Sequence, residues 1–350
     1  MGLTELLKRT VEQGGSDVFF IPGSPVTVKI ESTMQPLSEE KLTPADTEKQ
    51  VQGMYELAHR DYSLLEREGD DDFSFAIRDV SRFRCNAYRQ RGTLAAICRI
   101  VNFELPDPAR LHIPDIVMDL AGQRSGMVLV TGPAGSGKST TLACLVDRIN
   151  ATRAAHIVTI EDPIEYLHRH RKSLVSQREV PNDASTFSRA LRAALRQAPD
   201  VVMLGEMRDA DTVATAITAA ETGHLLLSSL HTIGAAKTVD RIIDVFPADQ
   251  QSQVRIQLSA VLRAVVSQRL VPTLDGKREA VFEVMQVNPA ISNMIRDGRT
   301  HQIDNVIYGA ADKTMMSMDA ELARLVRERR VSRETALLYA ANPETLAKRI

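Results

Sequence analysis

A glycine-rich segment followed by lysine and serine gives the strongest chemical signal in the sequence. Residues 132–139 read GPAGSGKS and fit the pattern G-x-x-x-x-G-K-[ST], between an aliphatic run at 127–130 and a helical pattern at 140–150. In this pattern backbone N–H groups surround the phosphates, Lys138 neutralises their charge and Ser139 binds Mg²⁺. The segment therefore predicts a site for ATP and Mg²⁺. We expect nucleotide contacts from Gly132, Pro133, Ala134, Gly135, Ser136, Gly137, Lys138, Ser139 and Thr140.

Carboxylates follow two of the neighbouring aliphatic runs. Glu206 comes after the run at 201–204 and is the candidate acid on the metal side, where its long side chain suits a contact to Mg²⁺ through water. Glu161, Asp162 and Glu165 follow the run at 156–160, at the kind of strand end where ligands gather in open α/β sheets. One of these acids could polarise the attacking water. The alternatives are that Asp162 and Glu165 cap the next turn and that Glu206 is a surface acid.

Two histidines bracket the aliphatic run at 225–229. His224 precedes this run and His231 follows it. An imidazole in such a place can hydrogen-bond the γ-phosphate or respond to its loss, although a histidine satisfied by a backbone partner is the common alternative. The pair predicts a loop whose position depends on the nucleotide.

Basic residues gather in two further places. Alternation along a predicted strand places Arg82 and Arg84 on one face, near further arginines of the same strand pair. This cluster is either a solvated basic face or the source of an arginine finger that reaches a phosphate across a subunit interface. The run at 168–172, which reads HRHRK, is predicted to be an exposed or interface loop.

Length and composition narrow the class of protein. The chain has 350 residues, enough for about two domains, with 43% hydrophobic and 25% charged residues, which excludes disordered and collagen-like chains. A net charge of -2 and 4% aromatic residues without Trp argue against a nucleic-acid partner. The three cysteines form no C-x-x-C pair, so neither disulfides nor a thiolate zinc site is indicated. With no signal peptide and no long apolar stretch, we expect a cytoplasmic chain that does not insert into a membrane.

The segment 1–102 reads as an α+β domain. A helix is predicted from Leu3 to the glycines at 14 and 15, and a helical stretch from 44 to about 68. The predicted strands are 18–21, 26–30, 73–77, 82–88 and 94–101. Prolines among acidic residues mark a linker at 103–112.

The segment 113–288 alternates aliphatic runs with helical patterns, as in an α/β domain with a parallel sheet buried on both faces. The predicted strands are 127–130, 156–160, 201–204 and 225–229, and the predicted helices between them are 140–150, 184–198 and 211–222, with Asp183 capping the second. Beyond residue 247 the chain is predicted to be mainly helical, most clearly at 254–268 and 319–328. The segment 289–350 is expected to form a helical C-terminal region.

Together these motifs resemble the hexameric ATPases of the secretion superfamily, and within them the type IV pilus retraction ATPases of the PilT and PilU kind. The resemblance covers nearly the whole chain, including the segments 15–17 (GSD), 82–86 (RFRCN), 161–165 (EDPIE) and 205–209 (GEMRD) and both histidines. It implies an N-terminal PAS-like α+β domain, a RecA-like P-loop ATPase domain with a helical C-terminal region, and a homo-hexameric ring.

The resemblance also implies roles for single residues. Glu165 would be the catalytic base, and Glu206 and Ser139 would hold the metal beside the catalytic Lys138. His231 would report on the γ-phosphate. Further nucleotide contacts are implied for Glu161, His224, Arg82 and Arg84.

Finer features bear on the role within the family. The chain lacks the four-cysteine zinc motif of assembly ATPases, and its segments 16–20, 168–180 and 267–272 look more like PilU than PilT. Ser292 stands where the retraction segment of PilT carries an arginine. The implied partners are a paralogous PilT-type ATPase and the inner-membrane platform protein of the pilus, at whose cytoplasmic face the ring would work. The alternatives are a weakly active nucleotide-binding protein that acts through a PilT motor, a nucleic-acid translocase and, formally, a small-molecule kinase.

Overall fold

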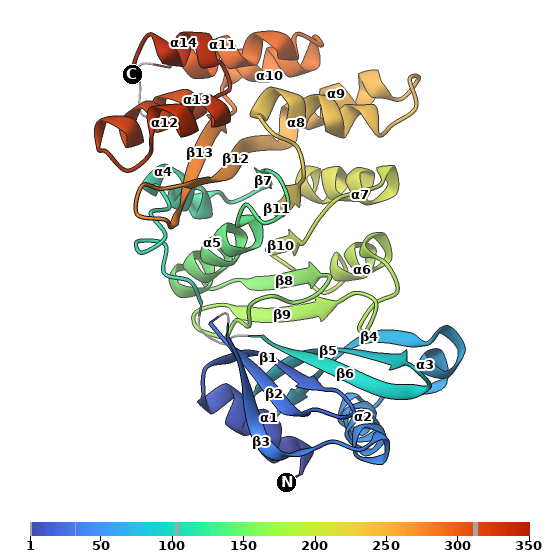
Figure 1. Ribbon diagram of the computed structural model, residues 1–350. Helices are drawn as coiled ribbons and strands as arrows, with labels where there is room; N and C mark the ends of the chain where they lie inside the picture. Colours follow the sequence, from blue (N-terminus) through green and yellow to red (C-terminus); the bar gives the residue numbers. More distant parts are fainter. Residues whose placement is uncertain (1, 32, 102–104, 311–313) are drawn as a thin grey trace. The chain divides into compact units, whose positions relative to one another are not determined.

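The chain forms two compact units in a computed structural model, which describes residues 2–31, 33–101, 105–310 and 314–350 (Figure 1). The first unit comprises Met1–Glu104 and Glu165–Leu167, and the second comprises Leu105–Ile164 and His168–Ile350. The short segment that carries the candidate base Glu165 therefore groups with the N-terminal unit. The predicted linker at 103–112 lies partly outside the described residues.

The first unit is built on an antiparallel sheet, in which the described residues form six strands in the order β3-β2-β1-β6-β5-β4 (Figure 1). The strands are β1 (Gly15–Phe20), β2 (Pro25–Ile30), β3 (Thr33–Lys41), β4 (Asp70–Ile77), β5 (Ser81–Gln90) and β6 (Thr93–Val101). The helices are α1 (Leu3–Glu12), α2 (Pro44–Ala58) and α3 (Ser63–Glu68). Leu7 of α1 and Met54 of α2 pack with Phe83 in one hydrophobic core. These helices therefore cover a single face of the sheet.

Strand β5 shows how the sequence selects the two faces. Phe83 and Cys85 are fully buried under the helices, while Arg82 and Arg84 alternate with them and are half-buried on the opposite face. Arg99 of the neighbouring strand is held by Asp17 through a 2.8 Å ion pair. The shared face predicted for Arg82 and Arg84 is confirmed.

Two expectations for this unit are corrected. The helical stretch predicted at 44–68 is two helices, because His59 adopts a left-handed backbone conformation (φ 50°) and ends α2. Strand β3 was not predicted, because its mainly exposed and polar residues show no clear alternation.

The second unit is built around a sheet whose seven described strands have the order β13-β12-β7-β11-β10-β8-β9. The strands are β7 (Gly126–Thr131), β8 (His156–Glu161), β9 (Leu174–Glu179), β10 (Val201–Leu204), β11 (Leu225–Leu230), β12 (Leu262–Pro272) and β13 (Arg278–Gln286). Every neighbouring pair is parallel except β12 with β13, which is antiparallel. The predicted parallel sheet is confirmed and extended at both edges.

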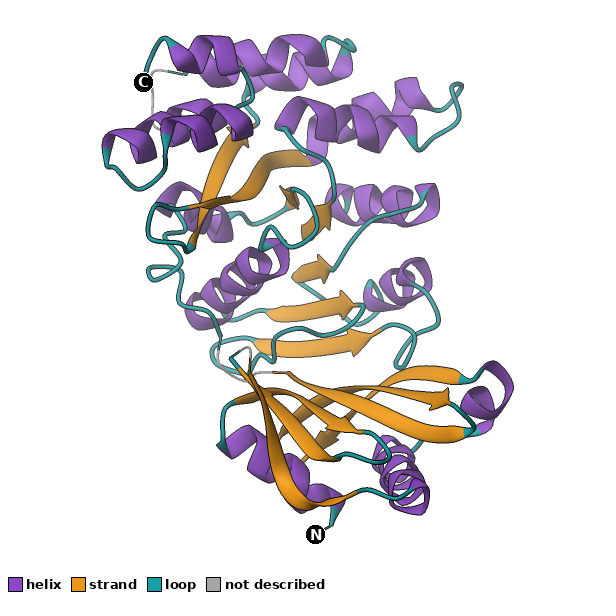
Figure 2. Ribbon diagram, viewed as in Figure 1, coloured by secondary structure: helices purple, strands orange, loops and turns teal. Residues whose placement is uncertain are grey.

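Helices cover both faces of this sheet (Figures 1 and 2). On one face lie α4 (Asp115–Met118), the 3-10 helix η1 (Asp119–Gly122) and α5 (Lys138–Thr152), and on the other lie α6 (Phe187–Ala194), α7 (Ala210–Glu221), α8 (Ala235–Asp244) and α9 (Gln251–Val261). Successive residues of β7 alternate between the two cores, as Val128 joins the α5 side and Leu129 the α7 side. Because both faces are apolar, the central strands read as continuous aliphatic runs.

Further helices follow β13 and make the predicted helical C-terminal region. They are α10 (Pro289–Arg296), η2 (Thr300–Gln302), α11 (Ile303–Gly309), α12 (Met318–Arg327), α13 (Arg333–Tyr339) and α14 (Pro343–Ala347). Leu322 of α12 and Leu346 of α14 pack against Val271 and Val281 of the edge hairpin. Over the described part of the chain, no helix combines the length and the apolar character needed to cross a bilayer.

Two helix predictions in this unit were wrong. The helix predicted at 254–268 ends at Val261, and β12 begins at the next residue, where an apolar, β-branched run is buried on both faces and gives no alternation to reveal a strand. The helix predicted at 184–198 is only Phe187–Ala194. Its cap is Thr186, whose side chain accepts from the amide of Arg189, whereas Asp183 accepts from the amide of Glu179.

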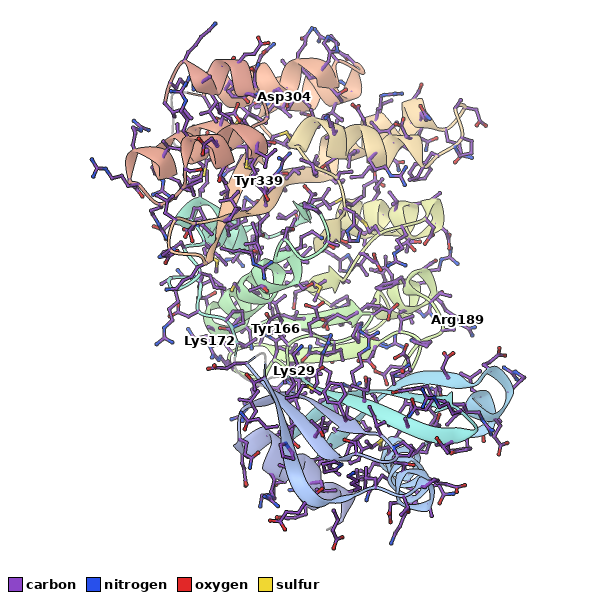
Figure 3. The ribbon with its side chains drawn as sticks, in the orientation of Figure 1. Lys29, Tyr166, Lys172, Arg189, Asp304 and Tyr339 are labelled. Atoms are coloured by element: carbon purple, nitrogen blue, oxygen red, sulfur yellow. The ribbon has the colours of Figure 1, made fainter. Side chains whose placement is uncertain are left out.

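The basic run at 168–172 is held in place rather than loose. His168 is buried, while residues 169–172, including Lys172 (Figure 3), are exposed. The side chain of Asn150 in α5 donates to the carbonyl of Arg169 (2.7 Å) and accepts from the amide of Arg171 (3.1 Å). The run is therefore a fixed, basic loop with one buried histidine.

Candidate active site

The candidate site lies at the carboxyl ends of adjacent parallel strands. Thr131 of β7 pairs with Leu230 of β11 on one side and with Ser267 of β12 on the other. The residue that follows each of these three along the chain belongs to the site: Gly132, His231 and Gln268. Segments that are far apart in the sequence thus meet at one edge of the sheet, the position where open α/β sheets bind ligands.

The glycine-rich loop has the backbone expected of a phosphate cradle. Gly137 has a left-handed conformation (φ 89°) at the start of α5, so the helix N-terminus faces the loop. Lys138 is buried, and its Nζ donates to the carbonyls of Gly132 (3.0 Å) and Pro133 (2.9 Å). Ser139 and the crest residues of the loop are exposed. The segment offers backbone amides, an ammonium group and an exposed hydroxyl to a phosphate and its metal.

Gln268 supports this loop and was not among the predicted site residues. Its backbone oxygen would lie 2.1 Å from a Cβ on Gly132, and its side-chain nitrogen would lie 2.9 Å from a Cβ on Gly137. The oxygen of the same side chain accepts from the hydroxyl of Thr141 at 2.7 Å. The prediction of a helix across this segment concealed the residue. A Ser-Gln pair inside an otherwise apolar run was the available signal.

Glu206 and His231 meet beside Lys138. Nδ1 of His231 lies 3.4 Å from Nζ of Lys138, and Nε2 of the same ring lies 3.5 Å from a carboxylate oxygen of Glu206. Since an ammonium group only donates, Nδ1 can act only as the acceptor in a hydrogen bond with Lys138, and Nε2 is the ring nitrogen that faces Glu206. Arg208 pairs with the other oxygen of Glu206 at 2.6 Å. The three predicted residues Lys138, Glu206 and His231 therefore form one continuous array.

The fold separates the acidic residues of the segment 161–165 into two sets. Glu161 is buried and accepts hydrogen bonds from Thr159 (2.7 Å) and Gln177 (3.2 Å). It also lies next to the strand end that carries Glu206, because a Cβ on Gly205 would be 3.4 Å from its Cα. Asp162 and Glu165 are exposed. Glu161 thus belongs to the site edge of the second unit, while Glu165 lies in the segment grouped with the first.

One other predicted residue of the second unit, His224, is not brought together with this array. His224 lies at the opposite end of β11 from His231, where its Nδ1 is 2.9 Å from the carbonyl of Ala219 and 3.1 Å from the hydroxyl of Thr222. Six residues of strand separate the two histidines, or roughly 20 Å. Arg82 and Arg84 belong to the first unit.

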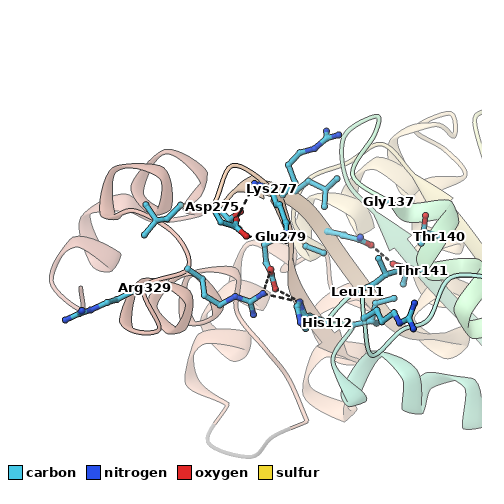
Figure 4. Close-up of a pocket in the computed structure, with 18 residues that line it drawn as sticks. Leu111, His112, Gly137, Thr140, Thr141, Asp275, Lys277, Glu279 and Arg329 are labelled. Atoms are coloured by element: carbon cyan, nitrogen blue, oxygen red, sulfur yellow. Dashed lines mark hydrogen bonds and ion pairs between the residues drawn. The ribbon is translucent and has the colours of Figure 1, made fainter. Parts of the chain in front are cut away.

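A cavity of about 790 Å³ opens beside the start of α5 (Figure 4). Gly137 and Thr140 line it together with apolar side chains such as Leu111 and Leu270. Its polar side chains include Glu279, which is buried and pairs with His112 at 3.1 Å as well as with Arg330. Gly137 and Thr140 were predicted nucleotide contacts, whereas Leu111, His112, Leu270 and Glu279 were not predicted, because they come from the linker and from strands that the sequence did not reveal.

A metal would be held by few protein ligands. Within the described ranges, no three side chains of the types His, Cys, Asp and Glu converge as a metal-binding cluster. This suits Mg²⁺, which keeps several waters and takes one or two protein ligands together with phosphate oxygens. The exposed Ser139 and the largely buried carboxylate of Glu206 fit such a site.

Comparisons with known proteins place the chain among secretion and pilus ATPases. Residues 112–348 match the family described as type II/IV secretion system protein. The chain is 41% identical to the type IV pilus retraction ATPase PilT of Pseudomonas aeruginosa PAO1, over 98% of this chain and 99% of the relative. It is 38% identical to the type IV pilus ATPase PilU of the same organism, over 99% of this chain and 90% of the relative.

A solved structure agrees with these relatives. The crystal structure of the pilus retraction motor PilT with bound ADP has a TM-score of 0.90 and 42% identity to the chain, and each covers 99% of the other. This likeness confirms the predicted fold class, with an antiparallel-sheet unit and a RecA-like ATPase unit. The expected closer resemblance to PilU is not supported, since the identity to PilT is slightly higher.

Proposed function

The chain belongs to the type II/IV secretion system protein family, and from this premise we propose that it is an ATPase that powers or assists the retraction of type IV pili in twitching motility. The observation that carries the proposal is the array of Lys138, His231 and Glu206, in which the ring of His231 lies 3.4 Å from the ammonium and 3.5 Å from the carboxylate. This array joins the phosphate cradle to a metal-side acid at one sheet edge.

ATP binds with its phosphates on the glycine-rich loop. The Nζ of Lys138, which donates to two loop carbonyls, turns to the β- and γ-phosphates, and the amides at the start of α5 complete the cradle. The nucleoside enters the cavity of about 790 Å³, where Leu111 and Leu270 supply apolar contacts and the group of His112, Glu279 and Arg330 supplies polar ones.

Hydrolysis uses Ser139 and Glu206 to hold Mg²⁺, which, when bound, neutralises charge that develops on the phosphoryl oxygens. His231 lies between Lys138 and Glu206, so a change in either partner alters the hydrogen bonds of its ring. Glu165 is the proposed base that orients the attacking water. Its carboxylate is exposed and lies in the segment grouped with the first unit.

The working particle is proposed to be a ring of six copies at the cytoplasmic face of the inner membrane. Arg82 and Arg84, on the face of the first unit that its helices leave uncovered, supply cations for a nucleotide bound at a subunit boundary. His224 would act on a nucleotide only from such a boundary, given its place at the far end of β11. The ring would move the pilus platform protein, with a PilT-type paralogue as a second partner.

One local difference favours an accessory role as the second candidate. In α10, Ser292 stands where PilT has an arginine, and its hydroxyl donates to the carbonyl of Ser259 in α9 at 2.8 Å. A short, internally bonded serine thus stands in place of a charged side chain. An accessory ATPase that works through a PilT motor would hydrolyse ATP efficiently only in the presence of that motor.

ATP turnover and particle mass test both candidates. We expect a particle of about six subunits that hydrolyses ATP with Mg²⁺, and loss of turnover in Lys138→Ala and Glu206→Gln by about a hundredfold or more. Undiminished turnover in Lys138→Ala would contradict the ATPase proposal. Turnover that appears only when PilT is added would favour the accessory role, and turnover that rises with single-stranded DNA and falls with salt would indicate a translocase.

A further inference from the structure

Two residues that face each other on neighbouring strands hydrogen-bond the loop that follows His231. Ser267 of β12 and Glu283 of β13 are directly opposite each other, so their side chains share one face of the sheet. The hydroxyl of Ser267 accepts from the amide of Gly234 at 2.9 Å, and the carboxylate of Glu283 accepts from the amide of Ala235 at 2.9 Å. Two consecutive amides, three and four residues after His231, are thus fixed to the sheet.

The loop between His231 and α8 is tied down at other points as well. The hydroxyl of Thr238 lies 2.7 Å from that of Thr232 and donates to the carbonyl of Gly234 at 2.8 Å. The same hydroxyl is 3.5 Å from Thr131, the residue that precedes the glycine-rich loop. The loop is therefore tied to the start of α8 and to the edge of the sheet from which the glycine-rich loop extends.

Glu283 also lies beside the start of α12. Val284, the next residue of β13, exchanges backbone hydrogen bonds of 2.7 and 3.0 Å with Met316, two residues before α12 begins, and Glu283 and Met318 line the same cavity. The side chain is 6% exposed, and burial raises the pKa of Glu283 while the amides of Ala235 and Met318 lower it. One buried acid thus binds the N-terminus of α8 behind the histidine loop and lies beside the N-terminus of α12 in the C-terminal region, and helix dipoles favour negative charge at both places.

Space for movement lies beside this junction. A cavity of about 820 Å³ is lined by Ile233 and Gly234 of the loop, by Glu283 and Met318, and by Asp304 of α11 (Figure 3). A small shift of the loop toward the C-terminal helices can therefore occur without displacing tightly packed side chains.

We propose that Glu283 is a positioning residue that sets the place of the His231 loop and couples it to the C-terminal helices through α12. Displacement of His231 when nucleotide binds or is hydrolysed pulls on the amides of Gly234 and Ala235, and the carboxylate passes this displacement to the first turn of α12. The inference rests on the proposed ATPase function, because His231 must respond to the nucleotide for the link to carry a signal.

The substitution Glu283→Gln tests the link with little change of shape. A glutamine removes the negative charge and replaces one acceptor oxygen with a donor NH2 group, so the acid's attraction for the amides at the starts of α8 and α12 is lost. We expect kcat for ATP to fall about tenfold or more while the Kd for ATP changes less than about threefold. Ser267→Ala removes one of the two loop contacts and should lower kcat by a smaller factor, and the double variant should lose less than the product of the two.

Asp71→Asn is the matched control. Asp71 is also a buried carboxylate, and it accepts from the hydroxyl of Tyr55 (2.9 Å) and from the guanidinium of Arg60 (2.9 and 2.8 Å), all within the first unit. Its substitution should lower the melting temperature while kcat, measured well below that temperature, stays within about twofold of wild type. An equal fall of kcat in Asp71→Asn would show that a general loss of stability, not coupling, is responsible, and would overturn the proposal.

A fluorescent reporter measures the coupling itself. The chain contains no Trp, and Leu338 on α13 is 79% exposed, so Leu338→Trp gives a single reporter in the C-terminal region. A non-hydrolysable ATP analogue should change the emission of this protein, and Glu283→Gln should abolish the change although the analogue still binds. An unaltered emission change in Glu283→Gln would overturn the coupling.

The two proposals fail separately. Absence of turnover in the wild-type protein with and without PilT would contradict the ATPase function itself. Normal wild-type turnover together with a wild-type kcat in Glu283→Gln would contradict only the role of Glu283. If Glu283→Gln does not fold, Ser267→Ala provides the same test. A kcat equal to that of wild type in this variant would show that the hydrogen bond to the amide of Gly234 does not affect catalysis.

Discussion

The hydroxyl of Thr141 donates a 2.7 Å hydrogen bond to the side-chain oxygen of Gln268, across 127 residues of chain. Both side chains are buried, and the bond ties the first turn of α5 to strand β12, whose backbone also closes against Gly132. Gln268, which is not part of the sequence motif, therefore supports the phosphate-binding loop. This relationship leads to the first prediction.

Gln268→Leu should weaken both stability and nucleotide binding. The apolar side chain leaves the buried hydroxyl of Thr141 without its acceptor, which costs about 1–2 kcal/mol of unfolding free energy, and the loosened loop should raise KM for ATP about fivefold or more. Urea unfolding and steady-state kinetics measure the two effects. Adding Thr141→Val should restore part of the stability, since both partners are then apolar. A further loss of stability in the double variant would contradict this explanation.

Two glycines of the same loop should respond differently to alanine. At Gly132 a Cβ would lie 2.1 Å from the carbonyl oxygen of Gln268 and φ is +146°, so Gly132→Ala should abolish ATP binding and cost more than about 2 kcal/mol of unfolding free energy. At Gly135 no atom comes within 4 Å of a Cβ, and only the positive φ of 73° opposes the change, so Gly135→Ala should cost about 1 kcal/mol. Calorimetry and nucleotide titration compare them, and equal effects would show that the contact with Gln268 is unimportant.

The two histidines should differ in their effect on catalysis. His231→Ala removes the ring between Lys138 and Glu206, so kcat should fall by about tenfold to a hundredfold with little change in the Kd for ATP. His224→Ala should lower kcat less, because His224 contacts the end of α7 at the far end of β11. Rapid-quench measurements of a single turnover separate the chemical step from binding. A larger effect at His224 would mean that it works at a subunit boundary.

Removing the charge of Glu279 in the nucleoside cavity should affect the binding of ATP more than its turnover. Glu279→Gln takes away the charge that pairs with His112 and Arg330, which should misplace both side chains and raise KM about threefold to tenfold with kcat nearly unchanged. Competition between ATP and GTP gives a second readout, because the cavity walls are expected to select the base. An unchanged KM would place the nucleoside elsewhere.

Acid should destabilise the protein partly through His168. Burial, with a smaller contribution from Arg171, lowers the pKa of His168 to about 4, so the unfolded chain binds a proton there at a higher pH than the folded chain does. The contribution of this neutral histidine is intact above its unfolded pKa of about 6.5 and is lost as the pH falls toward 4, by about 3 kcal/mol in total.

The variant His168→Leu isolates this effect. Its unfolding free energy should fall less between pH 7 and pH 4.5 than that of the wild type, by about 2–3 kcal/mol, since all other titrating groups are shared. Urea unfolding at the two pH values measures the difference. Parallel losses in both proteins would mean that His168 charges freely in the folded state.

The sequence by itself determined the local chemistry of the site. The glycines and the lysine at 132–139 have the spacing of a phosphate-binding loop and stand between a strand and a helix. They therefore predict a phosphate-binding turn. The central strands β7, β8, β10 and β11 were predictable for a similar reason, since each is a short aliphatic run between helices. The alternation in β5 likewise fixed the shared face of Arg82 and Arg84.

Only the tertiary structure decided which of these residues meet. His224 and His231 look equivalent in the sequence, but β11 is straight and parallel to β7, so only His231 reaches Lys138. Strand β12 was concealed because a strand buried on both faces carries no periodic signal, and with it Gln268 and Ser267 were overlooked. Strand pairing over long sequence separations, which is set by the packing of the whole sheet, placed these two side chains beneath the phosphate loop and behind the histidine loop.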